Sequence, residues 1–107
     1  MTLRTYQSIG IAGAAQTFAA VAASDTMLAD ERGFWEVVNG SGGSINVTVV
    51  VPGTVYGQAR ADVVVAVADG ARAKIGPLVP DLADPATSLV TITHSGTTSV
   101  TGAAIRI

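Results

Sequence analysis

Residues 37–59, VVNGSGGSINVTVVVPGTVYGQA, form an uncharged stretch between Glu36 and Arg60. About twenty uncharged residues in a row is also the length of a membrane-spanning helix. A lipid-spanning helix would not collect Gly, Asn and Pro at this density, however. The apolar residues recur at every second position, so that one face of the segment carries Ile45, Val47, Val49 and Val51. This period predicts a β-strand with one buried face, not a membrane span.

The same alternation recurs along the chain and is broken by turn signals. The expected strands are 34–39, 45–51, 61–68, 71–75, 88–94 and 98–107. The turns NGSGGS, Asp69-Gly70 and Ser95-Gly96 predict hairpins between successive strands, and Pro-Gly at 52–53 ends the second one. The proline-rich segment 76–86 predicts a loop.

Two segments upstream are less regular. Residues 16–22, QTFAAVA, are ambiguous, because their alanines favour a helix while Thr17, Phe18 and Val21 suit a strand. The segment SDTMLADERG predicts a short helical turn that is capped by Ser24 or Asp25 and stopped at Gly33.

About six to eight short strands with frequent turns indicate an all-β fold, an antiparallel β-sandwich or small jelly roll. We expect one sandwich domain over residues 14–107, preceded by an extended N-terminal arm over residues 1–13. The alternation places Val47, Val49, Val63 and Val65 on the inner faces of the sandwich.

Composition limits the partners that such a domain can have. Charged residues make up only 13% of the 107 residues, about half the usual share. With so few charges, an exposed apolar surface that binds another protein is expected. The net charge of −2 offers no electrostatic footprint for nucleic acid or for an anionic membrane. Cysteine is absent, so neither disulfides nor thiolate metal sites are expected.

Residues 1–24, MTLRTYQSIGIAGAAQTFAAVAAS, loosely resemble a signal peptide, but Gln7, Ser8, Gln16 and Thr17 interrupt the middle and secretion is not favoured. A short apolar segment needs a surface to pack against. The residues expected at an interface with another chain are Leu3, Arg4, Tyr6, Ile9 and Ile11, together with Tyr56. Tyr6 is equally compatible with contacts inside its own chain.

The sequence contains little that could carry out catalysis. His94 is the only histidine, and its neighbours predict a polar surface residue rather than a catalytic or ligand group. Asp81 and Asp84 could contribute to a calcium site, but such a site needs six or more oxygen ligands, and capping of local N–H groups is the favoured interpretation. The glycines of GSGGS lack the Lys-[Ser/Thr] of a phosphate-binding loop. We expect no enzyme activity, cofactor or metal.

The large aromatic residues Phe18, Phe34 and Trp35 are expected in the core rather than on a sugar-stacking platform. Trp35 shares the phase of Val37 in the first long strand.

Residues 34–78, from FWEVVNGSGG through PGTVYG and ADG to KIGPL, resemble the middle of a group of small tailed-bacteriophage virion proteins. The likeness covers roughly residues 17–80, with residues 90–105 as a closing hairpin. The matching positions are Phe34, Asn39, Gly40, Gly42, Ile45, Val47, Val49, Pro52, Gly53, Thr54, Val55, Gly57, Gly70, Ile75, Gly76 and Pro77. Residues 1–14 match no motif of the group.

Such proteins resemble capsid decoration, or cement, proteins. The resemblance implies a structural protein on the virion surface, assembled in the host cytoplasm, that stabilises the shell by bridging capsid subunits. The implied partners are the major capsid protein and further copies of the chain, a trimer being one form, with no nucleic acid and no membrane. The alternatives are a ligand-binding module of the carbohydrate type and a minor tail component.

Overall fold

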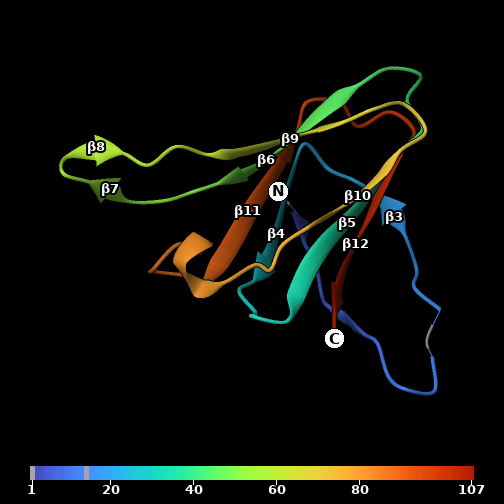
Figure 1. Ribbon diagram of the computed structural model, residues 1–107, viewed down its shortest axis with the longest axis horizontal. Helices are drawn as coiled ribbons and strands as arrows, with labels where there is room; N and C mark the ends of the chain where they lie inside the picture. The colour runs from blue at the N-terminus through green and yellow to red at the C-terminus, as the bar shows by residue number, and fades with distance from the viewer. Residues whose placement is uncertain (1, 14) are drawn as a thin grey trace.

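Two β-sheets face each other in the computed structural model, which describes residues 2–13 and 15–107 (Figure 1). The expected all-β sandwich is confirmed. Met1 is the first residue of the expected arm and Ala14 is the first residue of the expected domain. Both lie outside the described residues. The strands are β1 (Thr2–Leu3), β2 (Gln7–Ser8), β3 (Ala19–Ala20), β4 (Ser24–Leu28), β5 (Gly33–Asn39), β6 (Ile45–Val50), β7 (Thr54–Val55), β8 (Gln58–Ala59), β9 (Val63–Val67), β10 (Arg72–Ile75), β11 (Leu89–His94) and β12 (Val100–Arg106).

The first sheet has the strand order β1-β4-β11-β6-β9, and the second has the order β10-β5-β12-β2, with β3 also paired to β12. Strands β7 and β8 form a small ribbon of their own. Both large sheets are mixed, since β1 is parallel to β4 and β2 is parallel to β12. The other strand pairings of the described residues are antiparallel, as expected, and the two short strands of the arm are the exceptions.

Three hairpins that the turn signals predicted are absent. Strands β5 and β6, on either side of the NGSGGS turn, lie in different sheets. The same holds for β9 and β10 around Asp69-Gly70, and for β11 and β12 around Ser95-Gly96. Each turn carries the chain from one sheet across to the other. Strand order is set by burial of the apolar faces, and a glycine-rich turn allows either outcome.

The segment expected to hold a helical turn is instead strand β4, which pairs with β11. Asp25 and Met27 are fully buried on this strand and share a face. The ambiguous segment 16–22 contains only the short strand β3. Residues 76–86 form the expected loop, with one 3-10 turn at Pro80–Leu82.

The alternation within 45–51 is confirmed, because Ile45, Val47, Val49 and Val51 are all buried. The prediction for β9 was wrong in part: Val67 is buried, but Val65 is half-buried and Val63 is 46% exposed. Strand β9 lies at the edge of its sheet, so it has a neighbouring strand on one side only.

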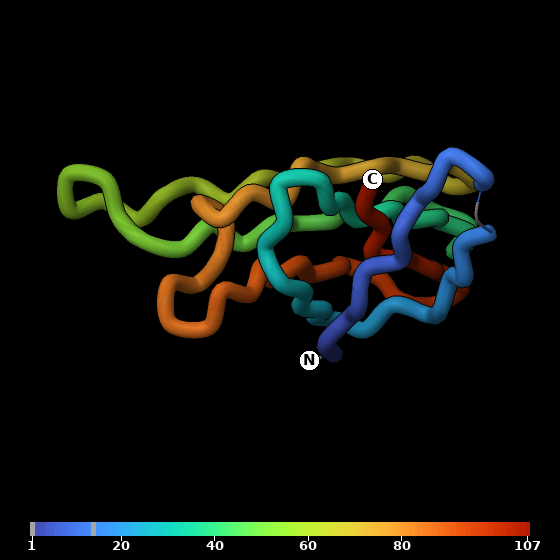
Figure 2. Tube along the Cα trace, turned by 90° about the horizontal axis from the view of Figure 1, so that it is seen from below, coloured from blue at the N-terminus to red at the C-terminus, as the bar shows by residue number. Residues whose placement is uncertain are grey.

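The arm is part of the sandwich rather than a free extension. Thr2 and Leu3 add to the first sheet beside β4, and Gln7 and Ser8 add to the second sheet beside β12. The arm thus crosses from one sheet to the other, as the blue end of the tube in Figure 2 shows. No helix among the described residues is long and apolar enough to cross a membrane.

Candidate protein interface

His94 is buried, so the prediction that it is a surface residue was wrong. Its Nδ1 lies 2.9 Å from the carbonyl oxygen of Ala22, and its Nε2 lies 3.2 Å from the indole nitrogen of Trp35. The indole N–H can only donate, so Nε2 accepts and Nδ1 carries the proton. His94 is held as one neutral tautomer. The sequence contained a signal for this burial, because His94 has the same phase in its strand as Val90 and Ile92.

A buried ion pair lies next to this histidine. The guanidinium of Arg4 donates from Nε to the carboxylate of Asp25 at 2.7 Å and from Nη2 to the carbonyl of Ala20 at 2.9 Å. The other oxygen of Asp25 accepts the N–H of Ala22 and lies 3.7 Å from Nδ1 of His94. Arg4, expected at an interface, instead fastens the arm to its own domain.

Removal from water lowers the pKa of His94 below its usual value of 6.5. The hydrogen bond to Ala22 and the charge of Asp25 oppose this shift, and the charge of Arg4 adds to it. The arrangement of His94, Asp25 and Trp35 is closed to substrate, since all three side chains are buried.

The loop carboxylates have local partners. Asp84 accepts the N–H of Ala86 at 2.9 Å, which is the capping role that the sequence favoured. Asp81 forms an ion pair of 2.7 Å with Arg60, and this contact lowers the pKa of the carboxyl. Among the described residues, no group of acidic or histidine side chains is arranged to hold a metal ion.

Trp35 lies in the core as expected and is unavailable for stacking on a ligand. Its ring lies directly over Gly102, so that a Cβ at this position would collide with the indole. Phe18 is half-buried, and the guanidinium of Arg72 lies 5.2 Å from its ring centre.

One element extends far from the sandwich. Strands β6 and β9 continue beyond the sheet as the ribbon β7–β8, which reaches out at the left of Figure 1 and again in the perpendicular view of Figure 2. Residues 52–59 carry no charged side chain. Arg60 holds the base of the ribbon, because its guanidinium contacts both the carbonyl of Pro52 and the carboxylate of Asp81. The base of the ribbon is therefore fixed by contacts within the chain, and its tip is uncharged.

Tyr56 at the tip of this ribbon is fully exposed, and Val55 beside it is 53% exposed. The backbone of Tyr56 has φ 54° and that of Gly57 has φ 77°. Positive φ at both central residues is the requirement of a type I′ turn, which favours Asn or Gly over a bulky aromatic residue. Neither packing nor local conformation within the chain therefore explains a tyrosine at this position.

The other expected interface residues fall into two groups. Leu3, Ile9 and Ile11 are 64%, 41% and 110% exposed. Tyr6 faces its own domain: its hydroxyl donates to the carbonyl of Leu28, and its ring lies against Gly33. Burial is the main cause that raises the pKa of Tyr6 to about 12, with the nearby charge of Asp30 adding to the shift.

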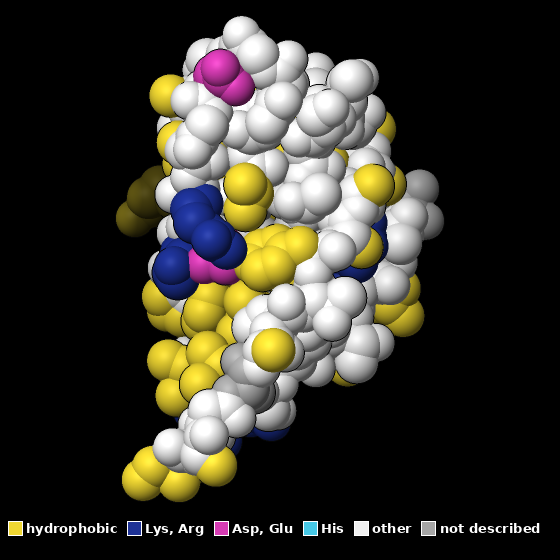
Figure 3. All heavy atoms as spheres, turned by 90° about the vertical axis from the view of Figure 1, so that its right-hand side faces the viewer, with side chains coloured by type: hydrophobic (Ala, Val, Ile, Leu, Met, Phe, Trp, Pro, Cys, Tyr) yellow, Lys and Arg dark blue, Asp and Glu magenta, His cyan; other side chains and the backbone are white. Residues whose placement is uncertain are grey.

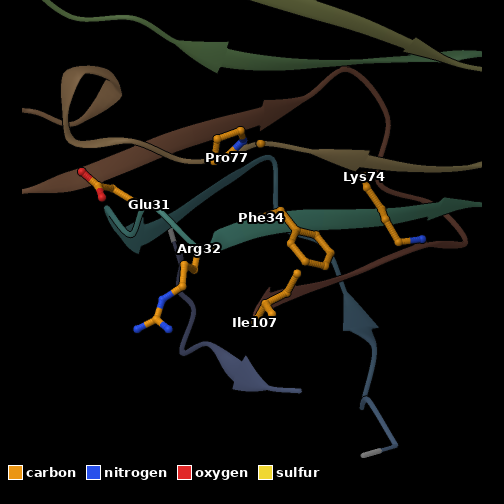
Figure 4. A pocket seen from close by; sticks show the side chains of 8 residues that line it. Glu31, Arg32, Phe34, Lys74, Pro77 and Ile107 are labelled. Carbon is orange, nitrogen blue, oxygen red and sulfur yellow. The ribbon is translucent and has the colours of Figure 1, made fainter. Parts of the chain in front are cut away.

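A pocket of about 440 Å³ opens beside β5, and no pattern in the sequence indicates it. Phe34, Pro77 and Ile107 give it an apolar floor, while Glu31, Arg32 and Lys74 lie at its rim (Figure 4). Lys74 is already engaged, since its ammonium lies 2.6 Å from the carboxylate of Glu36. The pocket presents no set of convergent polar groups that would mark it as a catalytic site.

The end of the molecule opposite the ribbon has a mixed surface. Figure 3 shows basic side chains around an acidic one on this face, with an apolar area beside them. Glu36 forms ion pairs with both Arg72, at 3.2 Å, and Lys74. Because two cations share one carboxylate, one positive charge is left over in this group.

No protein-family model matches the chain, and no curated protein and no solved structure matches it either.

Proposed function

We propose that this chain is a structural virion protein that decorates the outer face of a phage capsid and bridges neighbouring capsid subunits. The resemblance of residues 17–80 to small tailed-phage virion proteins supplies the biological setting. The protruding β7–β8 ribbon, with an exposed tyrosine at its tip, is the observation that carries the proposal. A bridging protein needs contact surface and shape rather than reactive groups.

The ribbon supports an interaction role because its tip is costly for an isolated chain. Tyr56 exposes a whole aromatic ring and holds an unfavourable backbone conformation. Tyrosine is enriched among the residues that contribute most to binding, since a rigid ring buries much area at little entropic cost. We assign to Tyr56 and Val55 the role of an anchor in an apolar recess of the capsid protein.

Bridging also requires a second contact point at a distance from the first. The described residues between β2 and β3, 9–13 and 15–18, include the fully exposed Ile11 and lie at the end of the molecule opposite the ribbon in both Figure 1 and Figure 2. The longest dimension of the molecule is 42 Å. Two apolar contact points so far apart can engage two capsid subunits at once.

A carbohydrate-binding role receives less support, because Trp35 is buried and no exposed row of aromatic residues accompanies Tyr56 among the described residues. A minor tail component would use the same kind of contacts as a capsid protein. Copy number separates these functions: hundreds of copies per particle indicate decoration, and a few copies indicate a tail part.

The proposal is tested by adding purified protein to shells that lack it. Tyr56→Asn keeps a residue suited to positive φ and removes the ring, and it should weaken binding about thirtyfold or more, in line with ~2 kcal/mol for an anchor residue. Thr98→Asn, in an exposed loop on another part of the surface, is the matched control and should bind normally. Equal binding by both variants, with equal melting temperatures, would contradict the anchor role. Absence of the protein from purified particles would contradict the function itself.

A further inference from the structure

The two sheets of the described chain have four edges, and three of them are protected against pairing with another strand. β1 and β2 contain only two residues each. β10 carries the exposed Arg72 and Lys74, which would repel the same residues of a second copy. Short edge strands and edge charges are the usual devices that prevent sheets from joining edge to edge.

The fourth edge, β9, has none of these devices. Its sequence Val63–Val67, VVVAV, contains no charge, no proline and no glycine. Val63 is 46% exposed and Val64 is 58% exposed, although a residue of this kind is normally buried. One long side of β9 is paired with β6, and the other side presents free backbone donors and acceptors.

The sandwich is also open beside this strand. A hollow of about 300 Å³ lies between the edges of β9 and β10, and it is lined mainly by apolar residues, among them Val63, Val65, Ile75 and Leu82. Val63 and Val65 have the same phase as the buried Val67, but Val65 is only half-buried and Val63 is exposed. A further strand beside β9 would cover this side of the core.

We propose that β9 of one chain pairs antiparallel with β9 of a second copy about a two-fold axis at Val65, so that the first sheet continues across two chains. The occupant is a second copy because the edge is uncharged and self-complementary, as a two-fold contact demands. The acidic residues that flank the strand do not meet each other in this register: Asp62 faces Ala68 and Asp69 faces Ala61 of the second copy. The two β7–β8 ribbons then point in opposite directions and stay free.

The pairing does not depend on the proposed capsid role, and it is measured on the free protein by sedimentation over a range of concentrations. The wild-type chain should form a dimer whose population rises with concentration. Val64 faces outward, so Val64→Lys should leave the monomer folded and raise the dimer dissociation constant about tenfold or more through repulsion of like charges across the edge. Val64→Thr is the matched control, because it keeps a β-branched neutral residue and should retain the dimer. Mixing Val64→Lys with Val64→Glu should restore dimers that neither variant forms alone.

Register is tested by cysteines, which the natural sequence lacks. Residue 64 faces residue 66 of the second copy, at a Cα separation within reach of a disulfide. A mixture of Val64→Cys and Ala66→Cys should therefore form mainly the mixed disulfide under mild oxidation, whereas Ser44→Cys, away from the edge, should not cross-link efficiently. A chain that stays monomeric up to about 1 mM, or a Val64→Lys variant that dimerises like Val64→Thr, overturns the proposal. Dimers without the mixed disulfide overturn the β9 register.

Discussion

The indole N–H of Trp35 donates a hydrogen bond to Nε2 of His94 inside the sandwich, at 3.2 Å, and so joins β5 of one sheet to β11 of the other. His94 in turn donates from Nδ1 to the carbonyl of Ala22. One histidine thereby connects both layers of the sandwich to the segment that precedes β4. His94 therefore contributes to the stability of the sandwich, and its replacement should destabilise the fold.

Replacing His94 with Ala should lower the free energy of unfolding by about 1–3 kcal/mol, because the Trp35 N–H and the Ala22 carbonyl would lose their buried partner. Denaturant unfolding followed by tryptophan fluorescence measures the loss. Thr98→Ala, at an exposed position, is the control and should change stability by less than about 0.5 kcal/mol. Equal stability of the two variants would show that water replaces the imidazole without cost.

The stability of the chain should depend on pH through His94. The pKa of His94 is lowered in the folded state below its usual 6.5, so the unfolded chain binds a proton more readily. The stabilisation is present above pH 6.5 and is lost as the pH falls from there through the folded pKa. Unfolding curves across this window should show the decline in the wild type and a flatter profile in His94→Gln. A parallel decline in both proteins would assign the effect to other groups.

Replacing Gly102 with Ala should destabilise the fold by about 1–3 kcal/mol, since the added methyl group would collide with the Trp35 ring in a packed core. Gly43→Ala is the matched control, because a Cβ at Gly43 meets no other atom within 4 Å. Thermal melts of the two variants measure the difference. A Gly102→Ala protein as stable as the control would indicate that the indole can shift without strain.

Replacing Arg4 with Ala should cost roughly 3 kcal/mol and loosen the arm, because the carboxylate of Asp25 would stay buried without its partner. Hydrogen exchange at the amide of Arg4, which donates to the carbonyl of Thr26, should also become faster than in the wild type. Arg60→Ala removes another ion pair of 2.7 Å, but the side chain of Asp81 is 72% exposed and stability should change little. Equal losses from the two variants would argue against a special role of the buried pair.

Replacing Val49 with Asp should destabilise the sandwich by about 3 kcal/mol or more, because a charge would be buried without a partner at a side chain that is 1% exposed. Asn46→Asp places the same side chain on the exposed face of β6 and is the matched control. Circular dichroism during denaturant unfolding compares the two. A folded and stable Val49→Asp variant would contradict the inner-face assignment.

Alternation in the sequence determined the fold class and the buried face of β6, because in a strand neighbouring side chains point to opposite sides whatever the strand pairs with. The same rule applied to 88–94 places His94 with Val90 and Ile92, although its polarity suggested the surface. Its burial depends on Trp35 and Ala22, which come from distant parts of the chain. A single strand cannot show whether such partners exist.

Tyr56 and Arg4 were both expected at an interface, but the structure places them differently. Tyr56 was expected at an interface, and the structure adds its full exposure and its positive φ. Arg4 was also expected at an interface with another chain, yet it pairs with Asp25 of its own β4. Both assignments depend on which parts of the chain lie near each other in the folded protein. The sequence of the arm and of the ribbon does not specify this.

By itself the sequence determined that the chain forms short β-strands, where six of the twelve strands in the described residues lie, and which residues of β6 are buried. Only the tertiary structure decided which strands pair, because a Gly-rich turn reverses the chain equally well within one sheet or between two. That choice separates β5 from β6, β9 from β10 and β11 from β12, and it leaves β9 as an open edge. It is made by the burial of all apolar faces at once, a property of the whole chain rather than of any segment.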